Sequence, residues 1–144
     1  MLRALVFWCL TALAPVAALS ATPPELAQSD ARAVRAAVEG QLKALAADRS
    51  DDAFAFATPE IRTRFHDAVL FAAMVRRSYP MLIRPASVSF FLPELNEGMV
   101  TQSIQVRDHE GNFWRVVYEM SRQPDGSWRI NGCAVAPDDD SSTT

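Results

Sequence analysis

The spacing of apolar residues changes once along this chain, near Pro85, and that change constrains the fold more than any other feature. Before Pro85, apolar residues recur every three or four positions, as in Val34, Val38, Leu42 and Leu45. That is the period of an amphipathic helix. After Pro85, apolar and polar residues alternate, as expected for strands with one buried face. The sequence therefore predicts an α+β domain in which helices precede a curved, four-stranded antiparallel sheet.

The first helix is predicted to begin at a capping residue, Ser29 or Asp30, and to end near Asp48. Residues 51–57 alternate like a strand, but their alanines and their position between helices favour a short helix. The Thr-Pro-Glu sequence at 58–60 is typical of a helix start, because proline is favoured at the first helical position.

In the helix that starts at 58–60, Ile61 and Phe65 are predicted to face inward. A further helix is expected over residues 69–77. Its inward residues are predicted to be Leu70, Ala73 and Met74.

Four strands joined by short turns are predicted after Pro85, the first of them with Val88, Phe90 and Leu92 on one face. In the last strand, Gly132 is expected to mark a bulge. The predicted core faces of the two central strands are Val100, Gln102, Ile104 and Val106, and Trp114, Val116, Tyr118 and Met120.

The amino terminus has the order of a secretory signal peptide: Arg3, an apolar run over 4–13, then small residues before a cut after Ser20 or Ala21. The apolar run is shorter than the roughly 20 residues that a membrane span needs. We therefore predict a signal peptide (1–21), a leader (22–28), one domain (29–136), a disordered tail (137–144) and a periplasmic or secreted protein.

Composition narrows the partners and cofactors that we expect. The net charge is −3, which speaks against nucleic acid as a partner, and no membrane attachment is expected after cleavage. Loss of Cys9 with the signal peptide leaves Cys133, which we interpret as a small buried residue rather than a nucleophile. His66 and His109 lack companion ligands at metal-binding spacings, so no metal or other cofactor is expected.

Five residues are candidates for ligand contact. Gln102 and Tyr118 are polar residues on the apolar faces of neighbouring strands, so they either line a cavity or bond each other in the core. Tyr79 and Arg84 flank the passage from helices to sheet, at a cavity mouth or as a corner brace. Trp128 stacks on a ligand or packs in the core. No catalytic residue is assigned.

The order of helices followed by a meander resembles the cone-shaped NTF2-like superfamily, named for nuclear transport factor two. At closer range the chain resembles an uncharacterised exported bacterial family, the domain of unknown function numbered 4864. The resemblance covers roughly residues 31–135 and lies in residues 56–62, 74–80, 84–88, 100–102 and 123–133. It implies a curved sheet with an open mouth, and it brings no established activity or catalytic residue.

Three hypotheses for function follow. The first is an exported, non-enzymatic domain that binds a small apolar or amphipathic ligand, or a protein partner, through a cone-shaped cavity. The second is a lyase, isomerase or hydrolase with a cavity acid, for which Asp67 is the available candidate. The third is a homodimerisation or assembly module that uses the outer face of the sheet. We favour binding over catalysis.

Overall fold

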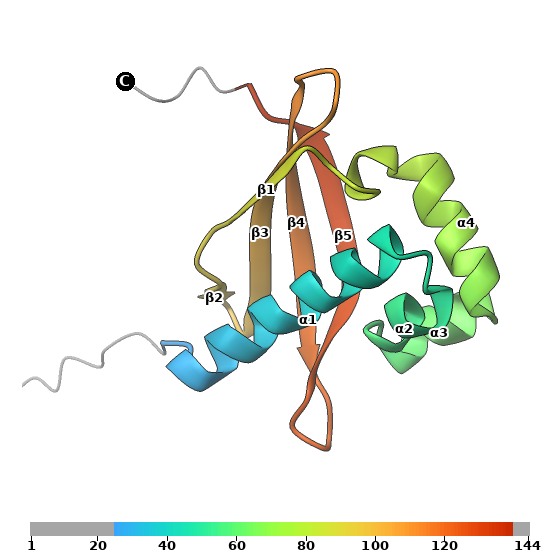
Figure 1. Cartoon of the computed structure of the whole chain (residues 1–144). Coiled ribbons are helices and arrows are strands. Elements are labelled where there is room, and N and C mark those ends of the chain that lie inside the picture. The colour runs from blue at the N-terminus through green and yellow to red at the C-terminus, as the bar shows by residue number, and fades with distance from the viewer. Residues whose placement is uncertain (1–24, 140–144) are drawn as a thin grey trace, which may run out of the picture.

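Helices occupy the first half of the described chain and strands the second half (Figure 1). The computed structural model describes residues 25–139, so the predicted signal peptide, residues 22–24 of the leader and residues 140–144 of the tail lie outside the described residues. The helices are α1 (Gln28–Ala46), α2 (Ser50–Ala55), α3 (Pro59–Phe65), α4 (Ala68–Ser78) and the 3-10 helix η1 (Pro80–Leu82). The strands are β1 (Ser87–Phe90), β2 (Glu94–Asn96), β3 (Met99–Arg107), β4 (Phe113–Arg122) and β5 (Trp128–Pro137).

The strands form one antiparallel sheet in the order β1-β3-β4-β5, and β2 pairs with the other end of β3. The sheet is curved and does not close on itself. Figure 1 shows α1 running across one face, with α2, α3 and α4 gathered beside β5. The predicted α+β class, with amino-terminal helices on a curved antiparallel sheet, is confirmed.

Helix α1 buries the predicted stripe, because Val34, Val38, Leu42 and Leu45 all lie in the core. The predicted capping position is wrong, since the helix begins at Gln28 and its cap residue makes no side-chain hydrogen bond. Asp30 instead turns toward the sheet, where its carboxylate accepts a hydrogen bond of 3.1 Å from the Trp128 indole.

The short second helix and the helix start at 58–60 are confirmed, and Thr58 accepts a hydrogen bond from the Ile61 amide. The predicted inward face of α4 is right for Met74, which packs against the core, and wrong for the other two residues: Leu70 is 56 % exposed and Ala73 is also exposed. The helix is rotated so that the Phe71 ring lies 5.3 Å from Phe54 and 5.6 Å from Phe65, centroid to centroid. Aromatic packing of this kind favours burial of phenylalanine over its neighbours.

The predicted core face of β3 is confirmed, since Val100, Gln102, Ile104 and Val106 are all buried. Strand β1 is shorter than predicted, and Leu92 is 85 % exposed instead of facing inward. The Gln102 amide donates a hydrogen bond of 2.8 Å to the Phe91 carbonyl. That carbonyl lies just beyond β1, so the bond holds the chain where it leaves the strand.

The predicted irregularity near Gly132 is confirmed as a bulge between β4 and β5. Met120 pairs with Ile130 and Glu119 pairs with Gly132, so Asn131 is an extra residue in β5. An extra residue reverses the alternation of the residues that follow it. Cys133, opposite Tyr118, therefore lies on the same side of the sheet as Ile130.

Candidate ligand cavity

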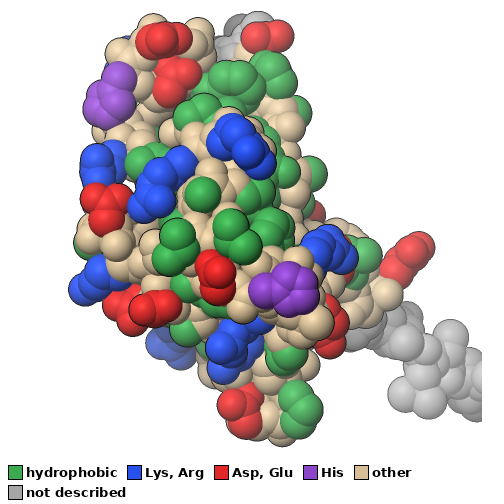
Figure 2. Space-filling model, turned by 90° about the vertical axis from the view of Figure 1, so that its right-hand side faces the viewer, with side chains coloured by type: hydrophobic (Ala, Val, Ile, Leu, Met, Phe, Trp, Pro, Cys, Tyr) green, Lys and Arg blue, Asp and Glu red, His purple; other side chains and the backbone are tan. Residues whose placement is uncertain are grey.

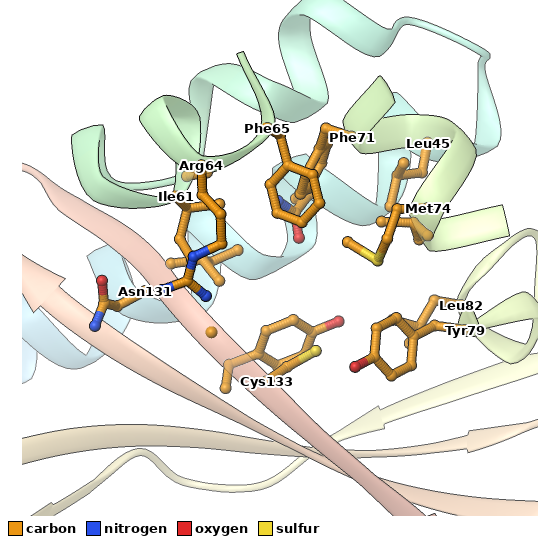
Figure 3. Close-up of a pocket in the computed structure, with 16 residues that line it drawn as sticks. Leu45, Ile61, Arg64, Phe65, Phe71, Met74, Tyr79, Leu82, Asn131 and Cys133 are labelled. Atoms are coloured by element: carbon orange, nitrogen blue, oxygen red, sulfur yellow. The ribbon is translucent and has the colours of Figure 1, made fainter. Parts of the chain in front are cut away.

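A cavity of about 240 Å³ lies between the helices α3 and α4 and the strand β5. Figure 3 shows Phe65, Phe71 and Met74 on the helical side and Cys133 on the sheet side, with Tyr79 and Leu82 toward one end. Most of the wall is apolar, as is usual for sites that take small molecules. The apolar lining residues include Leu45, Ile61, Phe65, Phe71, Met74, Val75, Leu82 and Ile130.

The Tyr118 side chain is one of the polar groups in the wall. It is 1 % exposed, and its hydroxyl has no hydrogen-bond partner among residues 25–139. Burial, with a smaller contribution from Cys133, raises the pKa of Tyr118 well above its usual range, so the hydroxyl stays protonated and can donate. A buried hydroxyl without a partner costs about 1–3 kcal/mol, so this group in a residue of the cavity wall calls for an explanation.

Cys133 reaches the cavity because of the bulge at Asn131. Burial raises the pKa of the Cys133 thiol, which keeps it protonated and makes it a poor nucleophile. Cys133 is not among the ligand residues predicted from the sequence. Counting the alternation of β5 across the predicted bulge would have placed the residue on the inner side of the sheet.

Arg64 and Asn131 lie together at the other end of the cavity (Figure 3). Arg64 extends from the last turn of α3 toward β5. Asn131 is fixed by two bonds: its carbonyl oxygen accepts from the Thr58 hydroxyl at 2.9 Å, and its amide donates to Glu119 at 3.0 Å. Neither residue is predicted from the sequence, because an exposed arginine on a short helix and an asparagine at a strand bulge give no signal of their own.

The five predicted ligand residues lie in four separate places. Tyr79 and Tyr118 line the cavity. Gln102 is opposite Tyr118 in the sheet but does not line the cavity, and its amide donates to two backbone carbonyls. Gln102 and Tyr118 do not bond each other, because the Gln102 carbonyl oxygen and the Tyr118 hydroxyl both lack partners within the described chain.

Arg84 and Trp128 lie away from the cavity. Arg84 donates to the Ala46 carbonyl and to Asp48, both at 2.8 Å, and thereby joins the end of α1 to the start of the sheet. Trp128 is half-buried, and its bond to Asp30 ties β5 to the first turn of α1.

No carboxylate or histidine lines the cavity in the part of the chain that the structure describes. Asp67, the candidate cavity acid, caps α4 by accepting a hydrogen bond of 2.8 Å from the Leu70 amide. The described residues contain no group of three metal-ligating side chains. None of the described helices is long and apolar enough to cross a membrane. Acidic and basic side chains are mixed on the described surface around α4 (Figure 2).

Comparison with known proteins gives one match. A family model described as Domain of unknown function (DUF4864) matches residues 27–143, which include every helix and strand described above. No curated protein and no solved structure matches the chain. Because the family match covers most of the sequence, the chain belongs to the DUF4864 family.

Proposed function

We propose that this domain binds a small amphipathic molecule in the cavity between α3, α4 and β5. The observation that carries the proposal is the Tyr118 hydroxyl, buried in the cavity wall without a partner among the described residues. Folded proteins rarely leave such a group unbonded, and each exception calls for an explanation. A ligand atom that accepts a hydrogen bond from this hydroxyl would explain why the group is unbonded in the ligand-free domain.

The volume of the cavity limits the size of the molecule. An engineered apolar cavity of about 150 Å³ holds benzene. Scaled from that, the 240 Å³ cavity has room for about ten nonhydrogen atoms. This is the size of an aromatic ring or a short alkyl chain with one polar group. We further propose that binding takes place after export, on the basis of the signal-peptide pattern at 1–21.

The test compares a blocked cavity with an intact one. Cys133→Leu places a larger side chain in the cavity, whereas Ala134→Leu places the same side chain on an exposed residue next to it. The full chain and both variants are purified and titrated by calorimetry with phenylacetate, phenylacetamide and octanoate. Native mass spectrometry of each purified chain reports any retained small molecule.

We expect at least one probe to bind the wild type and Ala134→Leu, with at least about tenfold loss in Cys133→Leu, provided that all three proteins unfold at similar temperatures. A tenfold loss of affinity is about 1.4 kcal/mol. Each buried CH₂ group contributes about 0.8 kcal/mol, so losing the burial of about two CH₂ groups of the ligand is enough. Binding that is equal in all three proteins would place the ligand elsewhere. Absence of both probe binding and retained mass would refute the proposal.

A further inference from the structure

We infer that the ligand is an anion: a small apolar carboxylate whose charged group lies against Arg64 and whose apolar part lies under Phe65, Phe71 and Met74. The inference rests on the proposed function and concerns the same cavity. It is carried by the position of Arg64, the only charged side chain among the described residues that line the cavity.

Arg64 is one of the arginines of the described chain that have no acidic partner there, whereas five others are paired. Arg76 and Arg84 both pair with Asp48, and Arg115 pairs with Asp138 at 2.8 Å. Two further pairs are Arg49 with Asp52 and Arg122 with Asp30. Within residues 25–139 no acid lies within ion-pair distance of Arg64, so its guanidinium is available to a ligand.

The surroundings of Arg64 favour a carboxylate over a neutral group. A guanidinium presents its donors in a planar fork that matches the two oxygens of a carboxylate. Figure 3 shows Arg64 directed toward β5 beside Ile61, so its charge lies next to apolar surface.

Two further polar groups of the wall, Tyr118 and Cys133, also favour an acceptor. The Tyr118 hydroxyl is protonated and without a partner in the described chain, and the Cys133 thiol is a weak donor. These two donors favour a molecule that brings oxygen acceptors. A carboxylate brings two of them and the charge that Arg64 complements.

The experiment separates charge from shape by using three probes of one size: phenylacetate, its neutral amide phenylacetamide, and the cation phenethylamine. Each is titrated by calorimetry into the full wild-type chain, Arg64→Gln and Arg62→Gln. Arg62 is the matched control, because it lies on the same helix but packs over the Phe54 ring and does not line the cavity. Arg64→Lys tests whether charge alone suffices.

We expect the wild type and Arg62→Gln to bind phenylacetate about tenfold more tightly than phenylacetamide, with no detectable binding of phenethylamine. Arg64→Gln should bring the acid and the amide within about twofold, and Arg64→Lys should keep part of the preference. The preference should weaken as salt is raised, since the Arg64 side chain is exposed.

Two results would overturn the inference while leaving the proposed function intact. One is equal binding of acid and amide by the wild type, with Cys133→Leu blocking both. The other is a preference for the acid that survives in Arg64→Gln, which would place the anion at another group. Failure of every probe, together with no retained mass, refutes the proposed function itself.

Discussion

Replacing Tyr118 with phenylalanine should stabilise the ligand-free domain, which is the opposite of what removal of a buried polar group usually does. The substitution deletes one oxygen and keeps the ring, which is 1 % exposed and packed in the core. In most proteins the lost hydroxyl was hydrogen-bonded, so its removal costs stability. Here the hydroxyl has no partner among residues 25–139, so folding strips its water and gives nothing in return.

The size of the effect follows from the desolvation of that one group. A buried hydroxyl left unpaired costs about 1–3 kcal/mol, so Tyr118→Phe should raise the free energy of unfolding by about 1 kcal/mol or more. For a domain of this size, that corresponds to a rise in melting temperature of about 4 °C. The assay is urea unfolding at neutral pH, with Tyr79→Phe as control, because Tyr79 is only half-buried and should change little.

The same variant should lose affinity for any ligand that bonds the hydroxyl, so stability and binding should move in opposite directions. A fall of more than 1 kcal/mol in the free energy of unfolding would mean that the hydroxyl is bonded in the folded protein. That outcome would refute the reasoning, and the proposed function would lose its main support.

Three further predictions concern other parts of the fold. Trp114 and Asn112 hold the pKa of Asp108 at about 2, below its usual value, so its stabilising contribution should be complete above about pH 3.9 and lost as the pH falls toward 2. As the pH is lowered, Asp108→Asn should lose less of its free energy of unfolding than the wild type does. An equal loss in both proteins would mean that other carboxylates cause the acid destabilisation. Burial raises the pKa of Cys133, so in a Cys9→Ser background its alkylation by iodoacetamide should accelerate only at a pH higher than the pH at which a free thiol reacts. A midpoint of the rate-against-pH curve at or below about pH 8.5 would contradict this. Gly40→Ala should lower the free energy of unfolding by about 1 kcal/mol despite the better helix propensity of alanine, because a Cβ there lies 2.4 Å from the Phe56 ring; greater stability on urea unfolding would show that the ring moves aside freely.

The parts of the fold with an unambiguous period could be predicted from the sequence. The apolar stripe of α1 and the alternation of β3 each leave only one side of the element that can be buried. Thr58 and Pro59 are residue types favoured at the start of a helix, so the beginning of α3 could also be predicted. Helix α4 is different, because its sequence Ala-Val-Leu-Phe-Ala-Ala-Met-Val is apolar on every side. Its orientation is set by the neighbouring rings of Phe54 and Phe65, which a local pattern does not contain.

The candidate cavity was less predictable than the fold. Tyr118 stood out as a polar residue on an apolar face, and it does line the cavity. Gln102 gave the same signal, but its amide is used to hold the backbone beyond β1. Arg64 and Asn131 gave none, since their position depends on how α3 meets β5. A sequence indicates which polar residues are unusual, but the meeting of distant elements decides what those residues contact.

The bulge at Asn131 makes the length of β5 adjustable at one point. Since no residue of β4 lies opposite Asn131 in the strand register, a chain one residue shorter here would still pair Ile130 with Met120 and Cys133 with Tyr118. The part of the cavity wall formed by Tyr118 and Cys133 would be preserved, while the hydrogen bonds of Asn131 with Thr58 and Glu119 would be lost. A deletion confined to this residue would thus change the end of the cavity beside Arg64 and leave the pairing opposite Tyr118 in place.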